Sequence, residues 1–337
     1  MRFCHWIPPH NANGEDAPAF GATDLWLLAV VLIWGVNTVA SKVVLEVVPA
    51  RDLYALRMVG IALLLWPIWR LIGSPQGTSG RPPVLLVILA GLLVTGQNAL
   101  FFWGLRRTTA DIAALIGNTS PLWAALALVA CGFQLFRLRN WAGFALGLGG
   151  AALMTFTRQH IEPTYAPAPG WGALACLCSA MCFGFYIVLT KGLMEQYGAL
   201  RILTLTYLFG GALSLPVAAL SAGHVPWAQM APAHWATLVF SIAIGGALGF
   251  AIWYQVLRGA NASRSVLYLY LVPVFAAVTA WIFLEEVLSP GQMVGMVMTT
   301  VGIYLARPEV TPRKPAVTEE PPEAAGHEPS QLVAEGH

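Results

Sequence analysis

The chain has 337 residues, of which 57% are hydrophobic and only 10% are charged. A soluble domain carries about 25% charged residues, so this composition excludes an ordinary soluble protein and indicates an integral membrane protein. The net charge is only +2, and no basic, aromatic-rich patch lies outside the apolar runs, so we expect no nucleic-acid partner.

Apolar runs follow one another along the chain, each near the length of about 20 residues that a helix needs to cross the hydrocarbon core. They predict an all-α integral membrane protein with ten transmembrane helices, at 24–48, 51–71, 83–105, 108–133, 140–157, 170–192, 199–221, 234–257, 262–284 and 288–306. Residues 1–23 lack the basic start and apolar centre of a signal peptide. We predict that residues 1–23 and the Pro-rich, acidic residues 307–337 are disordered.

The positions of Lys and Arg predict the orientation in the cytoplasmic membrane. With the N-terminus in the cytoplasm, twelve of these residues flank the helices on the inside and five on the outside. Because cytoplasmic flanks carry an excess of Lys and Arg, both termini are predicted to be cytoplasmic.

The membrane part contains an internal repeat. The stretch WGVNTVASK at 34–42 has the same pattern as FGFYIVLTK at 183–191, and further identities recur at offsets of 149 and then 152: Gly35 and Gly184, Lys42 and Lys191, Glu46 and Glu195, Pro121 and Pro273, Gly143 and Gly295, Gly150 and Gly302. Five helices is an odd number, so a second five-helix unit starts on the opposite side of the membrane. We therefore predict two inverted five-helix repeats, at 24–157 and 170–306, joined by an outer loop at 158–169.

The first hairpin, WGVNTVASKVVLEVVPARDLYALRMVGIALLLWPIW, resembles that of EamA-type carriers in the drug/metabolite transporter superfamily, with its Trp-Gly, its helix-end Lys and its Arg in the second helix. The closing pair of helices, ASRSVLYLYLVPVFAAVTAWIFLEEVLSPGQMVGMVMTTVGIYLA, is similar to that family as well. The resemblance covers about residues 24–306. It implies ten helices in two inverted repeats and a central cavity lined mainly by helices 1, 3, 4, 6, 8 and 9. It also implies export of a small metabolite such as an amino acid.

Polar side chains at membrane depth are costly, so they tend to line a wet path or pair with one another between helices. Together with Trp34, whose indole can donate a hydrogen bond, the predicted substrate-binding set is Asn37, Gln97, Asn98, Asn118, Thr119, Tyr186, Tyr254, Gln255, Tyr268 and Tyr270. Amides and tyrosines suit a small neutral or zwitterionic solute with apolar parts. The alternative is that these groups only hold helices together.

Two prolines and three charged residues complete the candidate site. Pro121 and Pro273 occupy equivalent mid-helix positions, where each is expected to bend its helix and free a carbonyl. Arg57 either extends to the outer surface or binds an anionic group such as a carboxylate. Asp111 and Glu285 fall near helix ends, where they are candidates for coupling.

The acidic residues all lie at predicted helix ends or outside the helices, and a proton relay usually needs an intramembrane carboxylate or His. We therefore expect either uniport driven by the substrate gradient or coupling through Asp111 or Glu285 near an outer mouth. The simplest explanation for Lys42 and Glu46 is an ion pair one helical turn apart.

The sequence thus predicts an alternating-access transporter that exports a small neutral or zwitterionic metabolite. Its expected partners are the solute and the lipid bilayer, and it is expected to act as a monomer or weak homodimer. A nucleotide-sugar or sugar-phosphate exchanger is the alternative transporter, but phosphates would call for several buried cations. An integral-membrane enzyme is the remaining alternative. No motif places a His beside a nucleophile or groups metal ligands, so we expect no enzyme, metal or cofactor.

Overall fold

The computed structural model describes residues 22–73, 80–130, 137–156, 167–253, 268–269, 271–285 and 289–306, and every regular element within these ranges is a helix. The predicted all-α fold class is therefore confirmed for the described part. The helices of the first half are α1 (Ala22–Val44), α2 (Ala50–Ile72), α3 (Val84–Leu105), α4 (Ala110–Gly117), α5 (Ser120–Ala130) and α6 (Leu138–Phe156).

The second half begins with two long helices, α7 (Pro169–Tyr197) and α8 (Ala199–His224). A short 3-10 helix, η2 (Trp227–Gln229), precedes α9 (Pro232–Val239), and α9 continues into a π-helix, η3 (Phe240–Leu248). The last helices are α12 (Val272–Leu284) and α13 (Pro290–Leu305). Each of the ten predicted spans overlaps at least one of these helices.

Seven helical stretches within the described ranges are long and apolar enough to cross a membrane: Asp24–Val44, Ala50–Leu71, Val84–Leu105, Ile112–Ala130, Pro169–Tyr197, Ala199–Ser221 and Pro232–Trp253. The chain is therefore a multi-pass membrane protein. α12 is apolar but shorter, and the ten crossings remain a prediction.

Proline and glycine mark several of the boundaries. Pro49 precedes α2, and Gly198 separates α7 from α8 with a φ of 90°. A side chain with a Cβ rarely adopts that backbone conformation, so glycine allows the chain to turn between the two helices. α1 ends at Val44, earlier than the predicted limit of 48.

The fourth and ninth predicted spans are interrupted rather than bent. Asn118 and Thr119 form a turn between α4 and α5, and Pro121 is the second residue of α5. Pro273 is likewise the second residue of α12, and this helix begins directly after the turn residue Leu271. Proline is favoured in the first turn of a helix because its missing N–H has no partner there.

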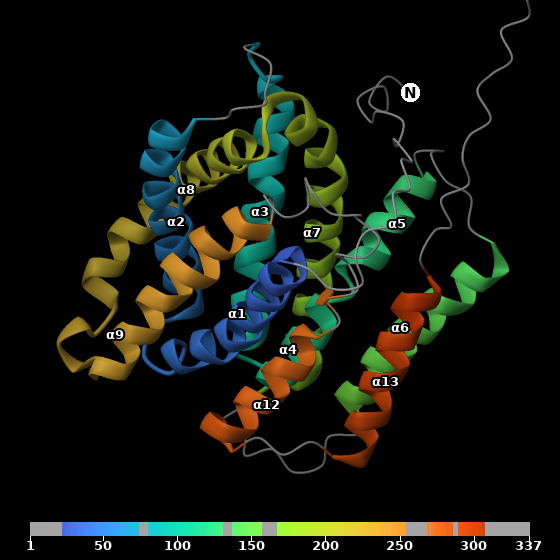
Figure 1. The fold of residues 1–337 in the computed structure, drawn as a ribbon. Helices are drawn as coiled ribbons and strands as arrows, with labels where there is room; N and C mark the ends of the chain where they lie inside the picture. The colour runs from blue at the N-terminus through green and yellow to red at the C-terminus, as the bar shows by residue number, and fades with distance from the viewer. Residues whose placement is uncertain are drawn as a thin grey trace, which may run out of the picture.

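The helices pair across the two halves of the chain. α6 packs along α13, α2 along α8, α3 along α7, and α1 against α12. Figure 1 shows α6 and α13 side by side at one edge of the bundle, while α1, α9 and α12 lie across its front. Long-range packing between the halves therefore builds the fold.

The glycines at these crossings occur in related pairs. A methyl group on Gly35 would lie 2.6 Å from the Cβ of Phe275, and one on Gly184 would lie 2.7 Å from the Cβ of Trp123. Trp123 and Phe275 are 152 positions apart, the offset of the internal repeat. Glycine lets helix backbones approach closely in membranes, so the same close crossing is built twice.

The contact between α6 and α13 follows the same rule. A Cβ on Gly143 would lie 2.7 Å from the Gly302 carbonyl oxygen, and a Cβ on Gly150 would lie 2.6 Å from that of Gly295. Gly295 and Gly302 are the repeat equivalents of Gly143 and Gly150. The contact of Gly143 with Gly302 is therefore the repeat equivalent of the contact of Gly150 with Gly295.

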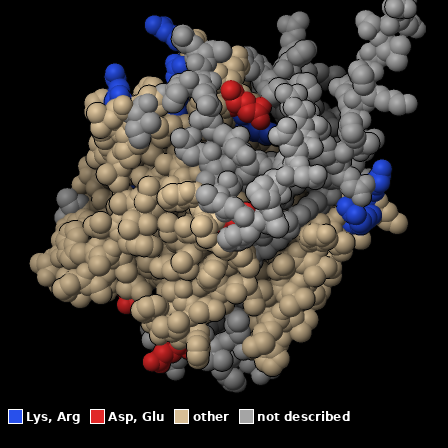
Figure 2. Space-filling model, viewed as in Figure 1, with Lys and Arg blue, Asp and Glu red and all other residues tan. Residues whose placement is uncertain are grey.

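Charged side chains are distributed unevenly over the surface. On the face in Figure 2, blue Lys and Arg side chains lie at the upper left and at the right edge, red side chains lie in the upper middle and at the lower left edge, and the surface between the upper and lower charges is mostly uncharged. An uncharged belt between charged ends is the surface expected of a chain that crosses a bilayer.

Candidate functional site: a central aromatic cluster beside a buried arginine

Aromatic side chains from four helical segments meet inside the bundle. The ring centroid of Phe250, which follows η3, lies 5.3 Å from that of Trp34 in α1, 6.3 Å from that of Phe183 in α7, and 5.8 Å from that of Tyr207 in α8. We call these four residues, with Tyr186 and Trp253, the central aromatic cluster. Trp34 and Phe183 are repeat equivalents, so the two copies of the repeated stretch at 34–42 and 183–191 both contact the ring of Phe250.

The indole of Trp34 also has a polar contact. Its Nε1 donates to the Gly245 carbonyl oxygen at 3.2 Å, and its ring lies 5.3 Å from that of Trp253. Gly245 belongs to the π-helix η3, and π-helical turns occur frequently at functional sites. The predicted cavity residue Trp34 is therefore anchored to an irregular backbone segment of the eighth predicted span.

A polar group lies next to this cluster. Nη1 of Arg57 in α2 donates to Asn37 Oδ1 in α1 at 3.3 Å and to the carbonyl and hydroxyl oxygens of Ser241 in η3. Ser41 Oγ in α1 lies 3.1 Å from Ser241 Oγ. All four side chains are buried, and they join three helices.

The structure contradicts one of the two interpretations of Arg57. Only 5% of the residue is exposed, and the guanidinium faces the Phe102 ring at 5.5 Å. Extension to the outer surface is therefore wrong, because the side chain points between helices. Its hydrogen-bonded partners Asn37 and Ser241 are both uncharged.

The second repeat contains an uncharged version of the same contact. Tyr186 and Thr206 are the equivalents of Asn37 and Arg57 at the offset of 149. The Tyr186 hydroxyl lies 3.4 Å from Thr206 Oγ1, and both residues are buried. The first two helices of each repeat are thus joined at equivalent positions, by a cation in one and a hydroxyl pair in the other.

Gln97 and Asn98 lie in α3 and bond mainly to their own helix. Asn98 Nδ2 lies 2.9 Å from the Val94 carbonyl oxygen and 2.8 Å from Gln97 Oε1. Ser179 of α7 donates to the Gln97 backbone carbonyl at 2.8 Å. Gln97 is only partly buried, whereas Asn98 is buried.

Asn118 and Thr119 occupy the turn between α4 and α5. Asn118 Nδ2 donates to the Leu269 carbonyl oxygen at 2.9 Å, which ties the interruption before Pro121 to the one before Pro273. Thr119 Oγ1 donates to the Ile116 carbonyl oxygen at 2.7 Å and accepts from Trp123 Nε1 at 3.3 Å. A carbonyl near Pro273 therefore has a side-chain donor from the other repeat.

The remaining predicted residues lie apart from the central aromatic cluster or outside the described set. The Tyr268 hydroxyl donates to Asp24 Oδ1 at 2.7 Å, near the start of α1. Glu285 is exposed at the end of α12 and has a left-handed φ of 55°. Tyr254, Gln255, Tyr270 and the side chain of Asp111 fall outside the described residues.

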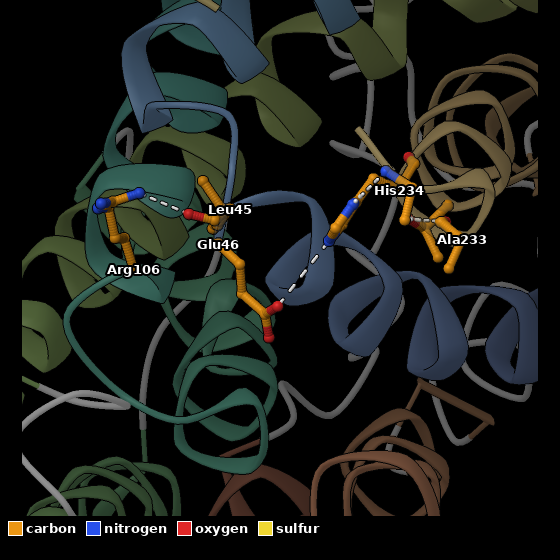
Figure 3. A network of polar contacts seen from close by, with 7 residues as sticks. Leu45, Glu46, Arg106, Ala233 and His234 are labelled. Carbon is orange, nitrogen blue, oxygen red and sulfur yellow. Dashed lines mark hydrogen bonds and ion pairs between the residues drawn. The ribbon is translucent and has the colours of Figure 1, made fainter. Parts of the chain in front are cut away.

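A separate polar network joins the end of α1 to α3 and α9 (Figure 3). Arg106 Nη1 donates to the Leu45 carbonyl oxygen at 2.5 Å, and Glu46 Oε2 lies 3.9 Å from His234 Nε2. The predicted pair between Lys42 and Glu46 is wrong. Because α1 ends at Val44, Glu46 is not on the helix, and Lys42 donates instead to the Thr108 carbonyl.

Sequence reasoning missed Ser241, Tyr207, Phe250 and Trp253. Aromatic residues within apolar runs look like ordinary core, and a single serine in such a run gives no signal of its own. Tyr207 could have been found, because a tyrosine at membrane depth needs a partner for its hydroxyl.

Apolar helices packed around buried polar and aromatic groups define a multi-pass membrane protein with an internal polar site. The sequence profile of the EamA-like transporter family matches residues 21–156 and, a second time, residues 170–307. The chain therefore belongs to this family of membrane transporters, and its membrane part is a duplication.

Relatives named as transporters cover most of the chain. An uncharacterized transporter of Synechocystis sp. is 26% identical over 83% of this chain and 88% of its own length, and one of Archaeoglobus fulgidus is 26% identical over 84% and 96%. A probable terminal-alkyne amino-acid exporter of Streptantibioticus cattleyicolor is 28% identical over 65% of this chain and 72% of that protein. One crystal structure, at 19% identity, shares the fold with a TM-score of 0.59 and covers 84% of this chain and 96% of its own.

Proposed function

We propose that this transporter exports a small neutral or zwitterionic metabolite, such as an amino acid, by alternating access. The observation that carries the proposal is the repetition of interhelical contacts at equivalent positions of the two halves, including the crossings at Gly35 and Gly184. Two related halves can exchange their packing about a fixed central site, which opens it to one side of the membrane and then the other.

The proposed topology follows from this relation. Ten helices form two inverted repeats, at 24–157 and 170–306, with the outer loop at 158–169 and both termini in the cytoplasm. The packing of α2 on α8 and of α6 on α13 supports it, because helices on a two-fold axis contact their own equivalents.

The chemistry of the central site supports the choice of substrate. The central aromatic cluster offers flat apolar faces, and the neighbouring amides and hydroxyls offer donors and acceptors. An amino acid combines an apolar side chain with a compact polar end and so fits such a boundary. The amino-acid exporter among the relatives is consistent with this substrate class.

The test is counterflow of labelled amino acids into proteoliposomes that contain the full-length protein. Wild type should exchange at least one amino acid, and Asn118→Leu should slow that exchange, because it removes the bond to the Leu269 carbonyl at the helix interruptions. If wild-type vesicles exchange no amino acid faster than protein-free vesicles, the proposed substrate class is wrong.

We further propose that the protein is a uniporter. Glu285 is exposed at a helix end rather than buried among the helices, which suits a surface group better than a proton relay. An imposed pH gradient should therefore not drive accumulation of the substrate. Accumulation that depends on the gradient and is lost in Glu285→Gln would show coupling instead.

A further inference from the structure

Among the described residues, Arg57 is a buried cation without a counter-ion. Across the described residues, its contacts are the neutral oxygens of Asn37 and Ser241 and the ring of Phe102, and no carboxylate lies within ion-pair distance. A buried charge that is not paired is strongly disfavoured. A guanidinium in this position is therefore a candidate for pairing with an anion from outside the protein.

The described residues leave one edge of the guanidinium free. The hydrogen bonds of Arg57 to other described residues all start from Nη1, and the buried Nε has no hydrogen-bond partner. The Nε edge of an arginine can present two parallel N–H groups, which match the two oxygens of a carboxylate. The bonds from Nη1 hold the side chain so that this edge remains available.

A second buried donor lies near Arg57. The hydroxyl of Tyr207 is buried near Arg57; within the described residues it makes no hydrogen bond of ordinary geometry, and the side chain of Asn98 is a polar neighbour. The Tyr207 ring contacts Phe250 within the central aromatic cluster. The guanidinium of Arg57, the Tyr207 hydroxyl and an apolar aromatic surface therefore lie in one region of the bundle.

The second repeat shows that packing does not require the charge. Thr206 joins α8 to Tyr186 of α7, as Arg57 joins α2 to Asn37 of α1, and it does so with a neutral hydroxyl. If Arg57 only tied two helices together, a small polar residue would be sufficient, as it is in the equivalent position. The cation adds a property that the structural contact does not need.

We propose that the free edge of Arg57 binds the carboxylate of the transported solute, with the Tyr207 hydroxyl as a second donor and the central aromatic cluster against the apolar part. This inference rests on the proposed transport function and narrows its substrate class to carboxylate-bearing solutes. A phosphate ester is a poorer match for a single guanidinium, because it carries more negative charge than a carboxylate does. In the described part of the chain, the other buried cation is Lys42, which is bonded to the Thr108 carbonyl at the end of α1.

Ligand binding to the purified full chain tests this assignment. The probes are the twenty protein amino acids, then the amide and the decarboxylated amine of the strongest binder, with glucose 6-phosphate as the phosphate ester. A ligand that binds only the folded state raises its melting temperature, so dissociation constants follow from the concentration dependence. The wild type should bind the acid at least tenfold more tightly than the amide or the amine.

Three variants identify the residue responsible. Arg57→Gln should bring the acid-to-amide ratio close to one, and Arg57→Lys should retain part of the preference, because it keeps the charge but loses the paired donors. Thr206→Val is the matched control: it removes the equivalent contact in the second repeat and should leave the ratio unchanged. The acid-to-amide ratio is measured on one folded variant at a time, so a loss of stability does not affect it. If Arg57→Gln does not fold, the ratio of Arg57→Lys compared with that of the wild type tests the proposal.

The outcomes separate the two proposals. An amide that binds as tightly as its acid, or a preference that persists in Arg57→Gln, would overturn the role of Arg57 and leave the transport function standing. Tight binding of glucose 6-phosphate alone would assign the same guanidinium to phosphate esters and overturn the carboxylate assignment. If wild type binds none of the probes, both this inference and the proposed substrate class are wrong.

Discussion

Gly245 illustrates how single residues set the geometry of the site. It lies in η3, where a Cβ would overlap the side-chain amide of Asn37, and its carbonyl accepts the indole N–H of Trp34. Asn37 in turn accepts from Arg57. One glycine therefore allows the first predicted helix to approach η3 closely enough for three side chains to take their positions.

Gly245→Ala should lower the free energy of unfolding by about 1–3 kcal/mol, the usual cost of extra volume in a packed core. The measurement is thermal unfolding of the purified protein in detergent. Gly149→Ala in α6 is the control, since nothing lies within 4 Å of a Cβ there, and it should leave the melting temperature unchanged or slightly higher. Equal losses in the two variants would contradict the close contact with Asn37.

At the scale of elements, the interruptions before Pro121 and Pro273 distinguish two helical segments from the rest. They are joined by the bond from Asn118 to the Leu269 carbonyl. Pro67 and Pro216, which are also repeat equivalents, lie within α2 and α8 without interrupting them. A proline therefore has two different effects in this protein, according to whether the turn before it is held open by tertiary contacts.

Pro121→Ala and Pro273→Ala should slow transport more than they lower the yield of folded protein, because a restored helical turn would close the interruption. The initial counterflow rate is compared with the amount of monodisperse protein from size-exclusion chromatography. Pro216→Ala provides the control within an uninterrupted helix and should change the two quantities in parallel. Parallel losses in the Pro121 and Pro273 variants would indicate a static packing role.

At the scale of the whole molecule, the proposed orientation gives opposite exposures to the N-terminus and to the end of α1. A variant whose only cysteine is Cys4 should react with a membrane-impermeant maleimide in inside-out vesicles and not in intact cells. A matched variant with a single cysteine at Glu46→Cys, an exposed position on the proposed outer side, should react in intact cells. Labelling of Cys4 in intact cells would show that the N-terminus lies outside and that the proposed orientation is wrong.

Most of the fold was accessible from the sequence, but its local geometry was not. The apolar runs located the helices, whereas the π-helix η3 and the end of α1 at Val44 depend on neighbours that the runs do not reveal. The error at Lys42 and Glu46 has this origin, because an i,i+4 pair requires a helix that continues. Tertiary contacts at the start of α9 placed Glu46 beside His234 instead.

The sequence by itself determined the membrane class, the duplication and the candidate status of Arg57, since apolar length, internal register and a charge within an apolar run are properties of the chain alone. Only the tertiary structure decided which groups meet. Asn37 and Ser241 are separated from Arg57 by 20 and 184 positions, yet they share its guanidinium. Such partners follow from helix packing between the two halves, and it is this packing that leaves Nε of Arg57 without a hydrogen-bond partner among the described residues.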